Sequence, residues 1–154
     1  MANSQLDSLD YRILKMLSQN ARKPYLEIAR ECNVSGAAVH QHIQKMYSLG
    51  VMKGSETLIE PSSVGYDTCA YIGFFLTDPS KFDEVVEQLK EIPEVVECHY
   101  TTGPYTMFIK LYARDNEHLM DLLNNKIQQI PGITGTETLV SLDLSIDREL
   151  PIEV

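Results

Sequence analysis

The chain has 154 residues, 44% of them hydrophobic, which suits one globular domain or two small ones. No stretch approaches the roughly 20 apolar residues of a membrane-spanning helix, and the first residues lack the basic start and apolar run of a secretory signal. We therefore expect a cytoplasmic protein with no membrane partner. The three cysteines are odd in number, widely spaced and without a CxxC motif, which argues against a disulfide framework and a zinc cluster.

The net charge of -9 is unevenly distributed along the chain. Residues 1–60 hold seven Lys/Arg and six Asp/Glu, whereas the remaining 94 residues hold six against sixteen. A nearly neutral N-terminal part can still present a basic face to phosphates, and the acidic remainder is repelled by them. The asymmetry is compatible with DNA binding by the N-terminal part.

Three short helices are predicted within the first 50 residues. Asp7 is a suitable N-cap for a helix over 8–19, Pro24 opens a second helix that ends near Asn33, and Ser35 caps a third that Gly50 ends. Their apolar residues recur at helical spacing: Leu9, Ile13, Leu14 and Leu17, then Leu26, Ile28 and Ala29, then Val39, Ile43 and Met46. Three short helices with tight turns indicate a helix-turn-helix. Residues 51–59 are predicted to form two short extended pieces, a wing or linker strand.

From Cys69 onward the pattern changes to alternating strands and helices. We predict strand 69–77, helix 80–91, strand 95–102, strand 105–113, helix 116–130 and strand 133–144, the βαββαβ order of a ferredoxin-like domain. The segment EIPEV at 91–95 is echoed by QIPGI at 129–133, each at a helix-to-strand junction. The predicted fold class is α+β: a winged helix-turn-helix over 1–52, a linker or wing strand over 53–67, and a ferredoxin-like oligomerisation and effector-sensing domain over 68–154.

The strand over 69–77 is apolar on both of its faces. Ala70, Ile72, Phe74 and Leu76 point to one side, and Cys69, Tyr71 and Phe75 to the other. A sheet covered by helices on one face only should be wet on the opposite face, so the second apolar row predicts a homodimer through this domain. The alternative is that the linker or the C-terminal segment covers these residues.

Several motifs resemble the Lrp/AsnC family, the feast/famine regulators. They are LDSLDYRIL at 6–14 with AR at 21–22, EIA at 27–29, NVS at 33–35, LGVM at 49–52, PEVVEC at 93–98, TGPY at 102–105 and PGI at 131–133. Their order and spacing carry the resemblance over nearly the whole chain. It implies a regulator that binds double-stranded DNA, homodimers that assemble into tetramers or octamers, and a small effector, commonly an amino acid, bound between dimers.

The outward face of the third helix is the predicted DNA-binding surface. The candidate residues are Ser35, Gly36, Ala37, Ala38, Gln41, His42, Gln44 and Lys45. Gln41 and Gln44 can pair with adenine edges, small residues at the helix start allow close approach, and Lys45 suits a phosphate. A plain solvated helix face is the alternative. The family usually has an arginine at His42. His40 and His42 point in different directions on a helix, so no metal site is predicted.

The turn between the second and third strands is the predicted effector site. The resemblance assigns it Thr102, Gly103, Pro104, Tyr105 and Thr106, and Thr136, Glu137 and Thr138 lie on the last strand. The family usually carries an aspartate at Thr106, which would hold an ammonium group. Three alternatives stay open: an amino acid held by other groups such as Glu137, a different ligand, or no ligand.

Two other functions compete with a ligand-responsive regulator. The first is a tetrapyrrole decarboxylase-like enzyme, since such proteins resemble this two-domain layout; the acidic second domain, with only His99 and His118, disfavours an anionic macrocycle. The second is a sensor module that has lost DNA binding. We predict no catalytic residues and no cofactor.

Overall fold

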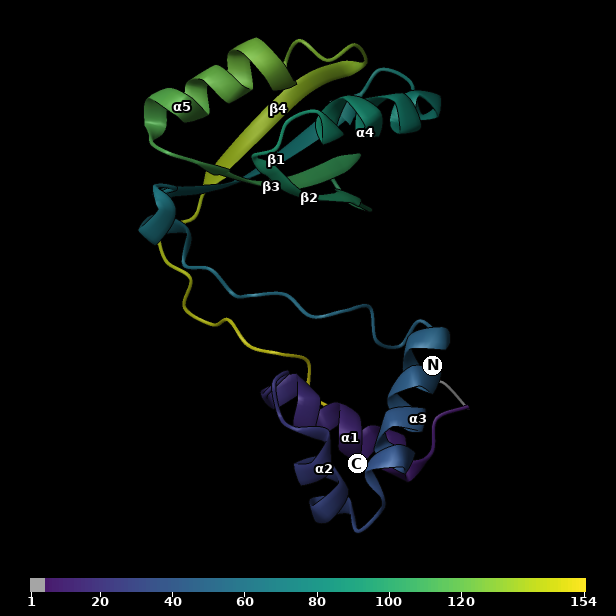
Figure 1. Ribbon diagram of the computed structural model, residues 1–154. Helices are drawn as coiled ribbons and strands as arrows, with labels where there is room; N and C mark the ends of the chain where they lie inside the picture. The colour runs from purple at the N-terminus through teal and green to yellow at the C-terminus, as the bar shows by residue number, and fades with distance from the viewer. Residues whose placement is uncertain (1–4) are drawn as a thin grey trace. The chain divides into compact units, whose positions relative to one another are not determined.

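The computed structural model describes residues 5–154, which form two compact units (Figure 1). The first contains the chain up to Thr57 together with Ile146–Val154, and the second spans Leu58–Ser145. No helix of the described residues is long and apolar enough to cross a membrane.

The first unit contains three helices: α1 (Ser8–Gln19), α2 (Tyr25–Cys32) and α3 (Gly36–Ser48). Asp7 and Ser35 cap α1 and α3 with their side chains, and Asn33 ends α2 in the left-handed conformation at φ 56°. The three helices pack around one apolar core, in which Ile13, Ile28, Val39, Ile43 and Met46 are almost fully buried. The predicted helices are confirmed.

The segment after α3 differs from the prediction. Residues 52–60 form neither helix nor strand, so the wing predicted over 51–59 is wrong. Leu58 and Ile59 are exposed there, and Gly54 has a φ of 143°. An isolated two-stranded hairpin is marginally stable, and the described part of this unit offers no third strand to support one.

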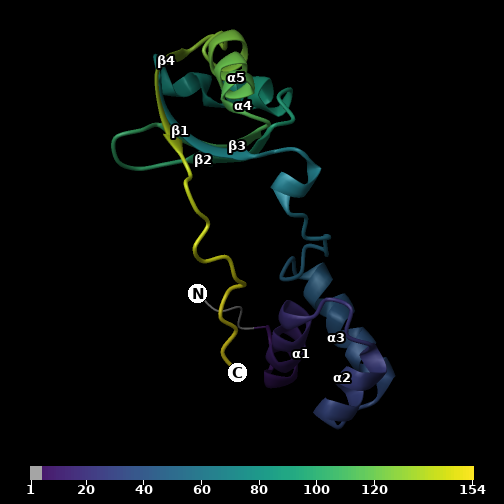
Figure 2. The same ribbon diagram turned by 90° about the vertical axis from the view of Figure 1, so that its left-hand side faces the viewer.

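The second unit is a four-stranded antiparallel sheet covered by helices on one face (Figure 2). Its strands are β1 (Thr68–Leu76), β2 (Val95–Tyr100), β3 (Met107–Ala113) and β4 (Ile133–Val140), in the spatial order β2-β3-β1-β4. The helices are α4 (Phe82–Lys90) and α5 (Asn116–Asp121), which continues as the π-helical segment η3 (Leu122–Ile127). Two short 3₁₀ helices, η1 (Pro61–Val64) and η2 (Pro79–Lys81), precede β1 and α4. The predicted βαββαβ order is confirmed.

The core of this unit lies between the sheet and its helices. Ile72 and Phe74 of β1, Ile109 and Leu111 of β3, and the helix residues Val85, Leu89, Leu122 and Ile127 are buried there. The last strand was predicted to reach residue 144 but ends at Val140. The hydrogen bond from the Ser141 amide to the Cys69 carbonyl lies at the beginning of β1, so residues 142–144 find no partner strand.

Candidate nucleic-acid interface and ligand site

The outward face of α3 is polar and open to solvent, as the helical spacing predicted. Ala37, Gln41, Gln44 and Ser48 are exposed, while Val39, Ile43 and Met46 face the core. Gly36 and Ala38, at the start of the helix, are half-buried. Within the described residues, neither the Gln41 nor the Gln44 amide hydrogen-bonds to the protein. Both side chains can therefore reach an external hydrogen-bonding group.

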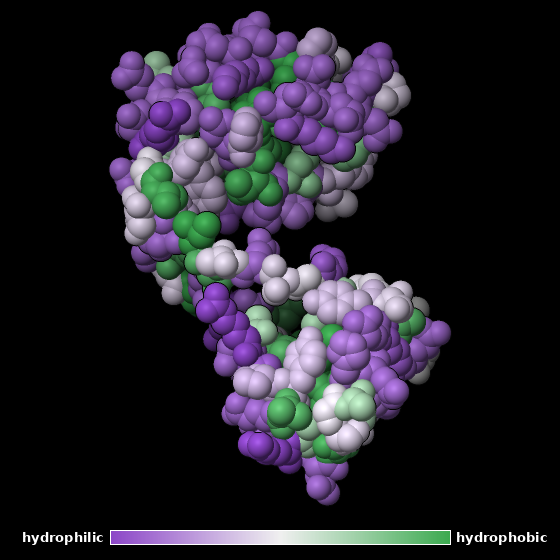
Figure 3. All heavy atoms as spheres, viewed as in Figure 1, coloured by the Kyte–Doolittle hydropathy of each residue, from purple (hydrophilic) through white to green (hydrophobic). Residues whose placement is uncertain are grey.

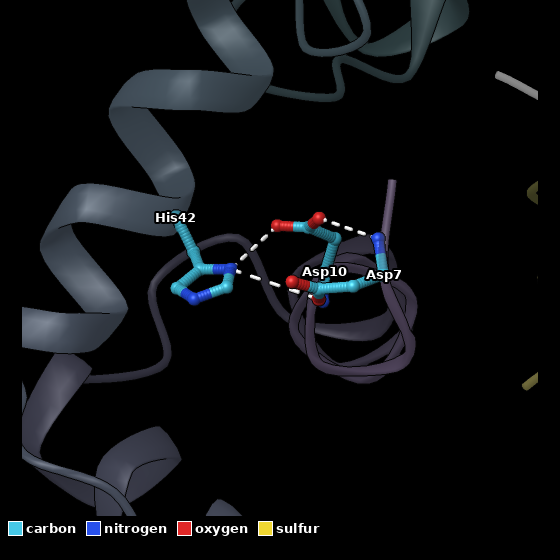
Figure 4. Close-up of side chains that lie close together, drawn as sticks. All are labelled: Asp7, Asp10 and His42. Atoms are coloured by element: carbon cyan, nitrogen blue, oxygen red, sulfur yellow. Dashed lines mark hydrogen bonds and ion pairs between the residues drawn. The ribbon is translucent and has the colours of Figure 1, made fainter. Parts of the chain in front are cut away.

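Two other candidate residues on α3 point inward to the N-terminus of α1. The His42 Nδ1 lies 2.6 Å from the Asp10 Oδ1 (Figure 4). The Lys45 ammonium donates to the Asp10 Oδ2. The Asp10 side chain is fully buried, whereas those of His42 and Lys45 are 22% and 35% exposed. We call Asp10, His42 and Lys45 the Asp10 clasp. The His42 Nδ1 and the Lys45 ammonium are thus engaged with Asp10 within the protein.

The clasp is built on the N-terminal cap of α1. The Asp10 amide donates to the Asp7 carboxylate at 2.9 Å, and the Asp7 amide donates to the Asp10 Oδ2 at 2.8 Å, a reciprocal capping box. Burial by itself would raise the pKa of Asp10, but hydrogen bonds from Lys45, the Asp7 amide and His42 outweigh it and hold that pKa below its usual value. The hydrogen bond that Lys45 donates to Asp10 also raises the pKa of Lys45. Asp10 is thus a buried anion whose two oxygens are both satisfied.

Asp7, Asp10 and His42 also lie close enough together to hold a metal ion, since their ligand atoms are within 4.8 Å of one another. The Lys45 ammonium already contacts Asp10 and lies 3.7 Å from Asp7. It therefore occupies the place that a cation would need, and the cluster is better described as an ion-pair network between helices.

The predicted effector turn closes on β1. The Thr101 hydroxyl donates to the Tyr105 carbonyl at 3.0 Å, and the Thr106 amide donates to the Phe74 carbonyl at 3.0 Å. The Tyr105 ring covers Gly73, where a Cβ atom would lie only 2.5 Å from the ring. Residues 102–104, with Gly103 at φ 98°, remain exposed. The turn is fixed at its base and open at its tip.

The eight predicted effector residues do not converge on one point. Tyr105 and Glu137 meet, because the Tyr105 hydroxyl donates to the Glu137 Oε2 at 2.6 Å, which raises the pKa of Tyr105. Thr136 and Thr138 pair with Phe74 and Ile72, whose side chains face the helices, so they lie on the opposite face of the sheet from Glu137. Thr136 instead accepts a hydrogen bond from Gln128 and lines a hollow of about 320 Å³ with it.

The face of the sheet that the helices leave uncovered is rich in aromatic side chains. We call it the open face; it comprises Cys69, Tyr71, Phe75, Glu97, His99, Tyr105, Phe108, Lys110, Tyr112, Glu137 and Leu139. The rings of Tyr71 and Phe108 stack at 5.8 Å, and Tyr105 lies 5.8 Å from Phe75. Phe75 and Leu139 are 45% and 48% exposed. Aromatic side chains therefore dominate the middle of this face.

Comparison with known proteins identifies the family of the chain. The AsnC-type helix-turn-helix domain matches residues 6–46, and the Lrp/AsnC ligand binding domain matches residues 69–150. The chain belongs to the Lrp/AsnC family. It is 39% identical to the regulatory protein AsnC of Haemophilus influenzae over 94% of this chain and 97% of that one. The structure of AsnC from Escherichia coli, 37% identical, superposes with a TM-score of 0.89 over 94% of this chain and 97% of that one.

A more distant structure shares the fold. The transcriptional regulator NMB0573 of Neisseria meningitidis, solved as an L-Met complex, is 19% identical and has a TM-score of 0.88 over 95% of this chain and 96% of that one.

Membership of the Lrp/AsnC family confirms the predicted function at the level of the class. The chain is a DNA-binding transcriptional regulator with a ligand-binding domain, and it is not an enzyme. The tetrapyrrole decarboxylase alternative is therefore removed.

Sequence reasoning missed the Asp10 clasp and the part played by Gln128. One signal of the clasp was present: Asp7 and Asp10 stand three residues apart at the start of a helix, which is the spacing of a capping box. The partners of Asp10 on α3 are 32 and 35 residues away, and no local spacing reveals them.

Proposed function

We propose that this regulator reads DNA through Gln41 and Gln44, with Ser35, Gly36, Ala37 and Ala38 allowing the helix start to approach the duplex. One observation supports this. Both glutamine side chains lie on α3, the recognition helix of the helix-turn-helix, where they are exposed to solvent and make no hydrogen bond within the described protein. A glutamine amide can pair with the N6 and N7 of adenine in the major groove.

The clasp changes the predicted roles of His42 and Lys45. Because both contact the buried Asp10, we assign them to holding α3 against α1 and not to the phosphates. The phosphate contacts fall instead to exposed cations without an ion pair in the described chain, foremost Arg22, before α2, and Arg30, on α2. The helix that precedes the recognition helix crosses the DNA backbone in this motif, which suits these two positions.

The test is recovery of specific fragments from a pool of the source genome, followed by affinity measurements on one recovered site. Gln41→Ala and Gln44→Ala should each weaken specific binding about 5- to 150-fold and leave non-specific binding unchanged. Arg30→Ala should weaken both and reduce the salt dependence by about one phosphate contact. Gln88→Ala, at an exposed glutamine on α4, is the matched control. Unchanged specificity in both glutamine variants would refute the assignment.

We further propose that two chains associate through the open face, and that such dimers build tetramers or octamers. Its stacked aromatic rings and half-exposed Phe75 and Leu139 are an apolar surface of the kind that a partner covers. Phe75→Lys should shift sedimentation toward the monomer. Met120→Lys, at an even more exposed apolar residue on α5, should not. A Phe75→Lys variant that sediments like the unchanged protein would contradict this interface.

The effector that we propose is an amino acid, recognised by the Tyr105–Glu137 pair, which lies on the open face and therefore at the proposed dimer interface. A carboxylate is the natural partner of an α-ammonium group. Thr106 cannot provide one, but Glu137 places a carboxylate beside the turn, in contact with Tyr105. We also propose that the regulator acts in the cytoplasm.

Fragment recovery with and without a mixture of the twenty amino acids tests the effector. The pattern should shift with the mixture for the unchanged protein and not for Glu137→Gln. Glu91→Gln, at an exposed carboxylate after α4, serves as the control. A shift that survives Glu137→Gln would place the ammonium elsewhere, and no shift at all would leave a regulator without an amino-acid effector.

A further inference from the structure

His40 lies beside the two glutamines on α3 but has no part in the interface described above. At about 100° of helical rotation per residue, its direction differs by only about 40° from that of Gln44, one turn further along the helix. Both side chains are exposed. His40 therefore lies at the edge of the outward face, on the flank of α3 opposite to His42 and Lys45.

A tyrosine of α2 contacts this histidine. The ring centroids of Tyr25 and His40 are 6.2 Å apart and their planes are inclined at 46°, an ordinary geometry for packed aromatic rings. The two helices approach closely here, since a Cβ atom at Gly36 would lie 3.1 Å from the Leu26 Cδ2. Leu26 follows Tyr25 in the first turn of α2, and Gly36 is the first residue of α3. The Tyr25 ring thus supports one side of the His40 ring.

The pair is not part of the core of the first unit. Tyr25 is 41% exposed, and neither ring belongs to the apolar core around Ile13 and Ile43. Among the described residues, the two ring nitrogens of His40 and the Tyr25 hydroxyl make no hydrogen bond or ion pair. Figure 3 shows apolar side chains scattered among hydrophilic ones over this unit, which suits a surface that meets polar DNA. A polar ring that is supported and has free nitrogens is suited to an external partner.

The chemistry of the base edges indicates which partner His40 selects. In a helix-turn-helix, the N-terminal part of the recognition helix faces the bases of the major groove. A neutral imidazole has a single N–H donor. Guanine presents two neighbouring acceptors there, N7 and O6; adenine has a donor beside its one acceptor, thymine has a methyl group beside O4, and cytosine presents only a donor. A single donor therefore discriminates in favour of guanine.

We propose that His40 is a third base-reading residue, whose N–H group binds the N7/O6 edge of a guanine, and that Tyr25 is the positioning residue that supports its ring. Side chains four residues apart on a helix are about 5–6 Å apart at Cβ, and successive base pairs are about 3.4 Å apart. The guanine should therefore lie one or two base pairs from the position that Gln44 reads. This inference rests on the proposed reading of DNA by α3 and adds the base that His40 selects.

The experiment measures the affinity of full-length variants for a specific site recovered from the source genome, with each base pair of the site varied in turn. His40→Ala should weaken binding to the guanine-containing site about 5- to 20-fold and leave sites with another base at that position unchanged. Gln44→Ala should relax a different position. The proposal is overturned if His40→Ala weakens binding to all sites equally, or changes nothing while Gln44→Ala relaxes its own position. If neither variant relaxes any position, the proposed reading by α3 fails as well.

Guanine analogues show whether His40 touches the base directly. 7-Deazaguanine lacks N7, and 6-thioguanine carries a sulfur, a weak acceptor, in place of O6. At the position found with His40→Ala, at least one analogue should weaken binding of the unchanged protein about fivefold and leave binding of His40→Ala unaffected, because two changes that remove the same contact do not add. Losses that are equal in both proteins, or absent from both, would refute the contact.

Two substitutions of Tyr25 test its positioning role. Tyr25→Phe keeps the ring and should preserve the preference for guanine, whereas Tyr25→Ala should reduce that preference about 2- to 10-fold. Tyr47→Ala, at a tyrosine of almost equal exposure (42%) near the end of α3, is the matched control and should leave the preference unchanged. A loss of preference in Tyr25→Phe, or an unchanged preference in Tyr25→Ala, would contradict support by the ring. His40→Ala removes an exposed side chain and should fold normally, which thermal unfolding checks.

Discussion

Replacing Asp10 by asparagine is the most direct test of how α3 is held in place. The substitution keeps the shape of the side chain and removes its charge. Asparagine can still accept a hydrogen bond from the Asp7 amide, so part of the capping box survives. What is lost is the charge component of the two contacts with His42 and Lys45.

The size of the effect follows from the exposure of the partners. A hydrogen bond to a charged group contributes about 1.5–3 kcal/mol when well buried. The Lys45 and His42 side chains are 35% and 22% exposed, so solvent screening reduces each contribution to about 1 kcal/mol. Loss of a negative charge at the α1 N-terminus adds about 0.5 kcal/mol. We expect a loss of about 2–3 kcal/mol, which in a domain of this size lowers Tm by roughly 8–24 °C.

The assay is urea and thermal unfolding followed by the methyl NMR signals of Ile13 and Ile43, which report on the first unit alone. Asp67→Asn, at an exposed carboxylate in the second unit, should have no effect. A double-mutant cycle with Lys45→Met should give a coupling of about 1 kcal/mol. Zero coupling, or an Asp10→Asn variant as stable as the control, would show that the clasp does not hold the helices together.

Two further predictions concern acid stability and the turn. Because the folded pKa of Asp10 lies below its unfolded value of about 3.9, the stability that the clasp provides is fully present above pH 5 and disappears as pH falls through the folded pKa. The difference in unfolding free energy between the unchanged protein and Asp10→Asn should therefore disappear below about pH 4. Urea unfolding measures it, and a difference that stays the same down to about pH 2 would contradict this. Gly73→Ala should displace the Tyr105 ring and cost about 1–3 kcal/mol of unfolding free energy, whereas Gly135→Ala, where a Cβ atom has ordinary contacts, should cost less.

The fold was largely predictable because local signals agreed with the packing. Side-chain caps at Asp7 and Ser35 and the left-handed Asn33 fixed the helix ends, and the apolar spacing identified the buried faces. The errors occurred where pairing with a distant strand decides the structure. Residues 51–59 and 142–144 have extended-looking sequences, but neither segment finds a partner in the described chain. Alternation along a segment does not reveal whether another strand lies beside it.

The sites were predictable only in part, for a related reason. Periodicity correctly gave the outward positions of Gln41 and Gln44, since it depends on the helix alone. It could not show that His42 and Lys45 bend toward Asp10, because that depends on how α1 packs against α3. In the same way, alternation separates Glu137 from Thr136 and Thr138 on β4. Only the strand register shows that Glu137 meets Tyr105.

His42 stands where the Lrp/AsnC family usually has an arginine, and the clasp changes the meaning of that difference. If the position contacted a phosphate, His42→Arg would strengthen DNA binding and steepen its salt dependence by about one contact. In this structure the His42 Nδ1 faces a carboxylate that Lys45 already neutralises. A hydrogen-bond donor is sufficient there, and a second permanent charge adds little to DNA affinity. We therefore expect His42→Arg to leave the salt slope of DNA binding unchanged, with Arg30→Ala as the variant that shows a change can be detected. A slope that rises by about one in His42→Arg would return this position to the DNA interface.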